Sequence, residues 1–253
     1  MKLFIITKKQ LMAAICIVCG LVLAVAGSVG AIAATNRLLP IYSVETEKKQ
    51  IAISFDAAWG NSDTQKIIDV LNEYGVKATF FAVGAWVDKY PESVKALCDA
   101  GHSVQNHSNS HPHMPQLSIA KMKDEITSCN QKIKAITGVE PTLLRPPYGD
   151  YDNTLIETVE SLDMYTIQWD VDSLDWKDSS TAESICKRVI SKAKNGSIIL
   201  CHNGARHTAE ALPTILDTLK KDGYEFVLIS DLIYKENYEI DHTGKQCKIK
   251  DGE

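Results

Sequence analysis

Apolar and polar positions alternate along the chain in a way that predicts strands and helices following one another. Short apolar runs typical of buried strands lie at residues 51–55, 78–83, 102–106, 142–144, 164–169, 197–201 and 225–229. Between them, residues 64–74, 91–100, 118–137, 154–162, 182–193 and 209–221 show apolar positions at helical spacing. About seven strand-then-helix units predict an α/β fold, with a parallel sheet closed into a distorted (β/α) barrel.

The amino-terminal segment follows a different pattern. Residues 11–34 carry no charged side chain, and Lys2, Lys8 and Lys9 precede them. As a helix this segment would span about 36 Å, against a hydrocarbon core of about 30 Å. The lysines favour a single-pass transmembrane helix with the rest of the chain extracytoplasmic. The alternative is a signal peptide cleaved after Ala31-Ile32-Ala33, which would leave a secreted protein.

Composition suggests one main domain. The chain has 253 residues and a net charge of -5, and α/β barrels of this size are commonly one unit. We expect the lysines and membrane anchor at 1–35, a polar stalk at 36–49, the barrel at 50–235 and a polar tail at 236–253. No dense run of Lys and Arg is present, which argues against a nucleic-acid partner.

Ionisable residues follow the carboxyl ends of five predicted strands. They are Asp56, His107, His111, Arg145, Asp170, Asp172, Asp175 and His202. In a parallel barrel these strand ends form one rim, where active sites are built. A buried cluster of ionisable groups is costly to keep without a function. The pattern therefore predicts an active site at this rim.

Two of these residues are candidate metal ligands. His107 and His111 are four residues apart, so one helical turn would bring them onto the same face. Two imidazoles in that arrangement can chelate a divalent metal, and zinc suits two histidines with an open coordination position.

Five short motifs, in order, resemble the polysaccharide deacetylase family, also called the NodB-homology family or carbohydrate esterase family 4. They are Ser54-Phe55-Asp56, His107-Ser108-Asn109-Ser110-His111, Arg145-Pro146-Pro147-Tyr148-Gly149, Asp172-Ser173-Leu174-Asp175-Trp176 and Leu200-Cys201-His202. The run Phe55-Asp56-Ala57-Ala58-Trp59-Gly60 is most similar to the sporulation-type branch of the family.

The resemblance implies a hydrolase that removes N-acetyl groups from a cell-wall polysaccharide such as peptidoglycan, with a bound divalent metal. It implies the following roles: Asp56 as general base, His202 as general acid, Arg145 and Asp175 in the charged network around them, His107 and His111 as metal ligands, the Tyr148 backbone N–H as an oxyanion donor, and Trp176 and Leu200 as walls of the acetyl pocket.

Ala57 departs from the family pattern. The family has a second acidic residue at this position, which is a metal ligand. Asp63, Asn61 or additional waters could compensate for its loss, but none of them matches the family motif. The departure leaves open two alternatives, a catalytically weakened glycan-binding protein that has lost one metal ligand and a hydrolase of other amides. Trp59 is similarly ambiguous, since it can stack on a sugar or pack in the core.

Overall fold

A parallel sheet runs through the described part of the chain, residues 37–249 of the computed structural model. Its strand order is β6-β5-β4-β3-β2-β8-β7, and β9 also pairs with β2. The strands are β2 (Gln50–Ala57), β3 (Thr79–Ala82), β4 (Ser103–Asn106), β5 (Leu143–Leu144), β6 (Tyr165–Thr166), β7 (Val171–Asp172), β8 (Ile198–His202) and β9 (Glu225–Phe226).

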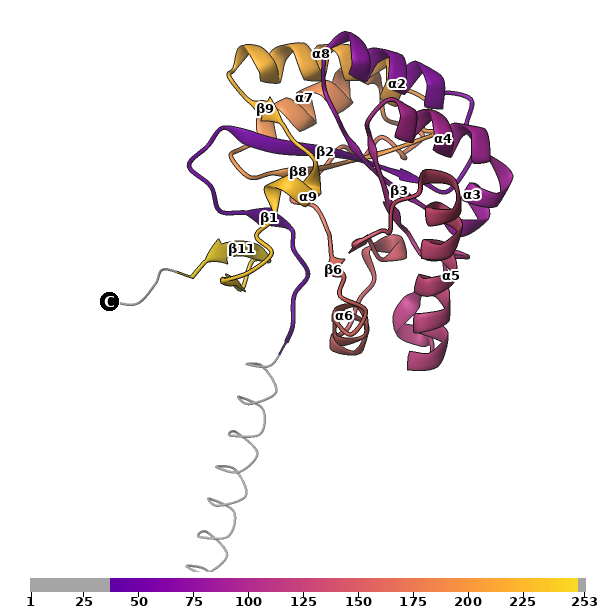
Figure 1. Ribbon diagram of the computed structural model, residues 1–253. Helices are drawn as coiled ribbons and strands as arrows, with labels where there is room; N and C mark the ends of the chain where they lie inside the picture. Colours follow the sequence, from indigo (N-terminus) through magenta and orange to yellow (C-terminus); the bar gives the residue numbers. More distant parts are fainter. Residues whose placement is uncertain (1–36, 250–253) are drawn as a thin grey trace, which may run out of the picture. The chain divides into compact units, whose positions relative to one another are not determined.

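Helices cover the outside of this sheet (Figure 1). They are α2 (Thr64–Glu73), α3 (Gly84–Lys89), α4 (Pro91–Asp99), α5 (Ile119–Thr137), α6 (Asn153–Glu160), α7 (Ala182–Lys192) and α8 (Thr208–Lys221). The short helix α9 (Ile229–Leu232) lies on the inner side instead, where Ile229 and Leu232 pack with Ala52 of β2 and Phe81 of β3. The 3-10 turns are η1 (Met114–Gln116) and η2 (Pro147–Gly149). Ser118 caps α5 by accepting the Lys121 N–H, and Gly138 ends the helix with φ 73°.

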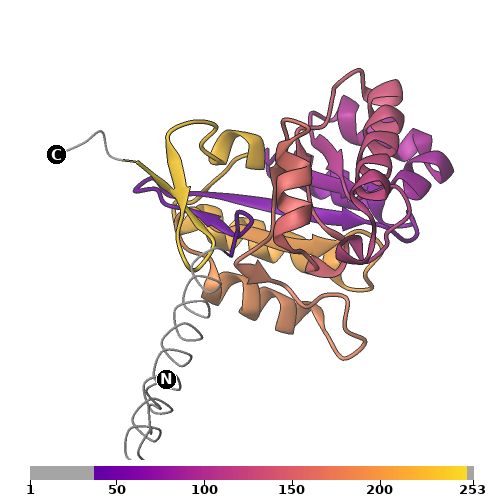
Figure 2. The same cartoon turned by 90° about the horizontal axis from the view of Figure 1, so that it is seen from below.

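The sheet curls but does not close. Its two edge strands, β6 and β7, are consecutive in the sequence, and no pairing between them is found in residues 37–249. The predicted strand at 164–169 is shorter in the structure, where β6 covers Tyr165–Thr166. β7 is a separate strand at Val171–Asp172, and the Asp170 carboxylate before it accepts the Ile198 N–H at the amino end of β8. The predicted α/β alternation is confirmed, whereas the barrel is an open half-barrel, which Figure 2 shows from a second direction.

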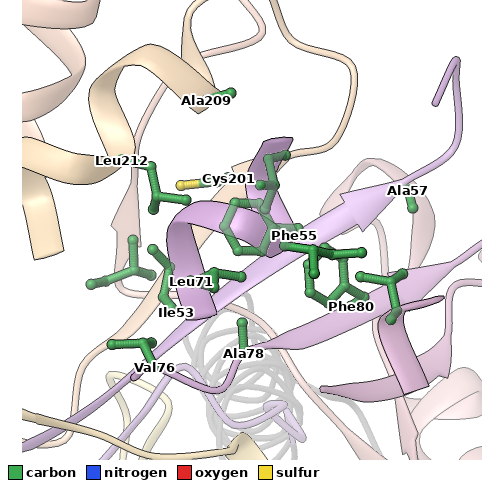
Figure 3. Close-up of a cluster of buried hydrophobic side chains, with 14 of the residues drawn as sticks. Ile53, Phe55, Ala57, Leu71, Val76, Ala78, Phe80, Cys201, Ala209 and Leu212 are labelled. Carbon is green, nitrogen blue, oxygen red and sulfur yellow. The ribbon is translucent and has the colours of Figure 1, made fainter. Parts of the chain in front are cut away.

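The main hydrophobic core lies between the sheet and the helices. Alternate residues of β2, namely Ile53, Phe55 and Ala57, join it and are fully buried. Figure 3 shows them with Phe80 of β3. Since successive side chains of a strand point to opposite faces, Ser54 and Asp56 face the inside of the curled sheet.

Residues expected to form a stalk and a tail are partly built into the fold. A three-stranded sheet pairs β1 (Ser43–Val44) with β11 (Lys245–Lys248), and β11 with β10 (Tyr238–Ile240). The Ile41 N–H donates to the Thr166 carbonyl, and the Ile41 carbonyl accepts the Gln168 N–H. Part of the predicted polar stalk thus packs into the fold, with apolar Ile41 and Val44 buried.

Within residues 37–249, no helix is both long enough and apolar enough to cross a membrane. The predicted anchor at 11–34 lies outside the described residues.

Candidate active site

The carboxyl ends of the strands surround one cavity of about 790 Å³. Eight residues predicted from the sequence line it: Asp56, His107, His111, Tyr148, Asp175, Trp176, Leu200 and His202. Arg145 lies beneath it and is fully buried. Asp172 also lines the cavity, whereas Asp170 does not, because its carboxylate accepts the Ile198 N–H and the Ser197 hydroxyl at the other end of β8.

Asp56 and His202 are neighbours on two adjacent strands. They are partners in the parallel register of β2 and β8, so their side chains lie side by side on the inner face. Asp56 and His202 are both buried apart from their edge on the cavity. The sheet itself thus places a carboxylate next to an imidazole.

Asp56 is held ionised by Arg145. Arg145 Nη1 donates to Asp56 Oδ1 at 2.7 Å, and Nη2 donates to the Ser54 hydroxyl at 2.8 Å. The guanidinium also lies 4.1 Å from the centre of the Phe81 ring, a cation–π contact. Burial alone would raise the pKa of Asp56, but the charges of Arg145 and the nearby histidines outweigh it and lower that pKa below its usual value.

His202 is paired with Asp175. Its Nδ1 donates to Asp175 Oδ1 at 2.7 Å, and its backbone N–H donates to Oδ2, also at 2.7 Å. The Thr208 hydroxyl donates to the same Oδ2 at 2.6 Å. Burial opposes protonation of His202, but the Asp175 carboxylate prevails and raises the pKa of the imidazole above its usual value.

The histidine pair lies on a loop after β4, not on a helix. Ser108 and His111 have φ 65° and 63°, which an α-helix excludes. The Glu125 carboxylate of α5 accepts the N–H groups of Asn109 and Ser110 in place of helical hydrogen bonds. The prediction of one helical turn is wrong, yet the loop still places the rings 4.9 Å apart, centre to centre.

The orientation of His107 fits a cation beside it. Its Nδ1 donates to the Arg145 carbonyl at 2.7 Å, so in the neutral ring Nε2 carries the lone pair, and burial lowers the pKa of this imidazole. That Nε2 lies 3.5 Å from Asp56 Oδ2. Two acceptors that face each other need a proton or a cation nearby. Burial and the neighbouring His107 lower the pKa of His111 to about 4. This ring is therefore neutral at pH 7 and has a lone pair that a cation can accept.

The ligand set is nevertheless short of one residue. Among the described residues, no group of three or more His, Cys, Asp or Glu side chains is arranged to hold a metal. Asp63 does not line the cavity, because its carboxylate accepts the Gly204 N–H, and Asn61 donates to Ser93. Neither therefore replaces the missing acid. His107 and His111 supply two donors of the three that catalytic zinc sites usually contain.

Tyr148 has a strained backbone at the rim. Its φ is 62°, a left-handed value that non-glycine residues rarely adopt. Its ring stacks on His113 with centres 4.3 Å apart, and His113 Nδ1 lies 3.0 Å from the Asp150 carboxylate. Within residues 37–249 no protein group accepts the Tyr148 N–H.

Sequence reasoning missed several supporting residues. Ser54 connects Arg145 to β8, because its hydroxyl donates to the Ile199 carbonyl. Its position two residues before Asp56 could have indicated this role, since strand residues two apart point to the same face. Thr208 and Glu125 had no such signal, because they reach the site from α8 and α5.

Known proteins are similar to this chain in sequence and in fold. Residues 43–167 match the family described as polysaccharide deacetylase. The peptidoglycan-N-acetylmuramic acid deacetylase PdaA of Bacillus subtilis is 34% identical over 202 residues, which cover 79% of this chain and 77% of PdaA. The chain belongs to the polysaccharide deacetylase family.

Other members of the polysaccharide deacetylase family extend the comparison. The peptidoglycan-N-acetylglucosamine deacetylase PgdA of Listeria monocytogenes is 38% identical over 198 residues, covering 78% of this chain and 41% of PgdA. The chain also spans only 60% of a further Bacillus subtilis relative.

A solved member of the family is a pseudoenzyme. The structure of BA3943 from Bacillus anthracis, described as a CE4 family pseudoenzyme, has a TM-score of 0.74 and 34% identity, covering 78% of this chain and 69% of BA3943. A BA3943 mutant is described as having restored enzymatic activity.

Proposed function

We propose that this protein hydrolyses N-acetyl groups on a cell-wall polysaccharide, namely peptidoglycan. The observation that carries the proposal is the pairing of an ionised carboxylate, Asp56, with a histidine of raised pKa, His202, in register on adjacent strands of one cavity. One group is prepared to accept a proton and the other to donate one. PdaA and PgdA, named as peptidoglycan deacetylases, support the substrate class.

Asp56 acts as the general base in this scheme. It takes a proton from the attacking water as the water oxygen forms a bond to the acetyl carbon. Arg145 keeps the carboxylate ionised and fixed in direction, because its Nη1 holds Oδ1 and leaves Oδ2 on the side of His107. The base therefore works in a buried place where it would otherwise be protonated.

His202 acts as the general acid. As the carbon–nitrogen bond breaks, the protonated imidazole gives its proton to the departing nitrogen, so the products are acetate and a free amine. Asp175 holds Nδ1, which leaves Nε2 for this transfer. The raised pKa keeps the ring protonated closer to neutral pH.

Tyr148, Trp176 and Leu200 complete the acetyl site in this proposal. The Tyr148 N–H would donate a hydrogen bond to the developing oxyanion. Leu200 lies beside His202 on β8, and Trp176 lies next to Asp175; both line the cavity. Their apolar surfaces suit the acetyl methyl group.

His107 and His111 would hold a divalent metal, and zinc is the ion that two imidazoles suit best. When bound, such an ion polarises the acetyl carbonyl and lowers the pKa of water. With two protein donors in place of three, we expect weak and exchangeable binding.

A second candidate function is glycan binding with weakened catalysis. Ala57 at the usual acidic position favours it, as does the likeness to the pseudoenzyme BA3943. The intact Asp56–Arg145 and His202–Asp175 pairs favour the enzyme, since a binding protein has no use for both.

An acetate-release assay on defined peptidoglycan fragments, with and without added zinc, separates the two candidates. We expect acetate release that zinc increases and a chelator removes. A folded, zinc-supplied protein that binds glycan without releasing acetate would support the binding protein instead.

We also propose that residues 11–34 anchor the protein in the cell membrane with its catalytic domain outside. The uncharged length and the preceding lysines support this location. Sequencing the amino terminus of the mature protein tests it, because a chain that begins near residue 34 would have lost its anchor.

A further inference from the structure

Trp59 is an exposed indole at the mouth of the cavity. It follows β2, lines the cavity and is 56% exposed. Its ring centre lies 5.8 Å from that of His202 and 6.3 Å from that of His111. The side chain therefore does not pack in the core. It lies beside His202, the proposed general acid, and His111, a proposed metal ligand.

The loop that carries Trp59 is held firmly. The Gly60 carbonyl accepts the indole N–H of buried Trp86 at 3.1 Å and the Asn203 side-chain amide at 2.9 Å. Asn203 is fully buried and also accepts the Thr64 hydroxyl at 2.8 Å. Since Asn203 directly follows His202, these bonds tie the loop to the general acid. Because these bonds fix the backbone beside Trp59, little backbone entropy is lost when a ligand binds the indole.

Two further rings line the same cavity. Tyr148 is 62% exposed and Trp176 is 53% exposed. The cavity volume of about 790 Å³ lies within the range of about 300–1,000 Å³ of small-molecule sites. Exposed aromatic faces around an acid–base pair suit a ligand with flat apolar faces and polar edges. A pyranose ring has this character, because its axial C–H bonds form the faces and its hydroxyls the rim.

We propose that Trp59 is a stacking platform for a pyranose ring of the glycan, and that it makes the site selective for sugars over small acyclic amides. The inference rests on the proposed function, since it assigns a substrate contact in that same cavity. Trp59 contacts the sugar and takes no part in proton transfer. Its loss should weaken glycan binding and raise KM while leaving kcat nearly unchanged.

The test compares the full-length protein with Trp59→Ala and Trp59→Phe. The probe is a soluble peptidoglycan tetrasaccharide of alternating N-acetylglucosamine and N-acetylmuramic acid. Calorimetric titration gives Kd, acetate release gives KM and kcat, and thermal unfolding confirms that each variant folds. We expect Trp59→Ala to raise Kd and KM about 10-fold, and Trp59→Phe, which retains an aromatic face, to raise them about threefold or less.

The outcomes separate this inference from the proposed function. Equal Kd values for the wild type and Trp59→Ala overturn the platform, even if acetate is released. An equal loss of glycan affinity in Trp59→Phe and Trp59→Ala also overturns it, because an aromatic ring at position 59 would then not be enough to bind the sugar. If the wild type releases no acetate but binds the tetrasaccharide more tightly than Trp59→Ala does, the stacking platform is supported and the deacetylase function is contradicted.

Discussion

His202 Nδ1 lies 2.7 Å from Asp175 Oδ1, and the other oxygen of that carboxylate accepts the backbone N–H of the same His202. One aspartate therefore fixes both the ring and the main chain of the histidine. This double contact orients the imidazole and raises its pKa against the opposing effect of burial. Asp175 is thus a residue that positions His202 and tunes it.

We expect Asp175→Asn to lower the pKa of His202, because an amide carries no negative charge. His202 has a raised pKa, so its protonated form stabilises the fold below the unfolded pKa of about 6.5, and this stability is lost as pH rises through the folded pKa. Turnover that depends on protonated His202 as the general acid is lost over the same pH range. In Asp175→Asn the alkaline limb of the acetate-release profile should move to lower pH, with a roughly 10-fold or greater loss of turnover on the alkaline side of the optimum.

Asp178→Asn is the matched control for Asp175→Asn. Asp178 also lines the cavity but makes no ion pair with His202 within the described residues. It should leave the alkaline limb in place. An NMR titration of the His202 ring measures the pKa without turnover, and an unchanged value in Asp175→Asn would contradict the tuning role.

His202→Ala should lower turnover by roughly 100-fold or more, the usual contribution of a general acid. The fold should remain, because Asp175 keeps its bonds to the backbone N–H of residue 202 and to the Thr208 hydroxyl. Acetate release and thermal unfolding measure the two effects separately. Near-normal turnover in a folded variant would remove His202 from the mechanism.

The sequence allowed prediction of those site residues that follow strand ends, and the structure shows why. Asp56 lies near the carboxyl end of β2, and His202 ends β8. The two strands pair in register, so strand position alone brings these side chains together. The histidine loop was less accessible to prediction: its left-handed residues depend on Glu125, which arrives from α5. Trp59 could not be assigned from its sequence context, because its exposure depends on bonds from Trp86 and Asn203 to the next residue.

Arg145→Met should destabilise the protein by about 3–5 kcal/mol at neutral pH, because it leaves the buried Asp56 carboxylate without its partner. The pKa of Asp56 is lowered in the wild type, so the stability that it provides is present above its unfolded pKa and is lost as pH falls through its folded pKa. The difference between wild type and variant should therefore shrink at low pH. Urea unfolding at several pH values measures it.

Asp56→Asn combined with Arg145→Met provides the control. With both charges removed, no lone buried charge remains, and the double variant should be more stable than Arg145→Met at neutral pH. A double variant as unstable as the single one would show that Arg145 acts through packing on Phe81 rather than through the carboxylate.

Ala57→Asp tests whether the chain has lost a metal ligand. Ala57 is fully buried with Phe55 and Phe80, although its neighbour Asp56 faces His107. A carboxylate at 57 should therefore destabilise the metal-free protein by about 1–3 kcal/mol. If residue 57 is a vacated ligand position, zinc should offset this loss by binding the folded variant more tightly than the wild type. Calorimetric titration and thermal unfolding, each with and without zinc, measure both parts.

Ala57→Asn is the matched control, since it has the same shape without the charge and should bind zinc more weakly than Ala57→Asp. His107→Ala in the Ala57→Asp background should abolish the gain, because the new carboxylate needs the histidines as co-ligands. Equal zinc affinity in the wild type and Ala57→Asp would show that residue 57 faces the core and cannot reach the ion. Zinc binding by His107→Ala as tight as in the wild type would go further, because His107 itself would then not be a ligand.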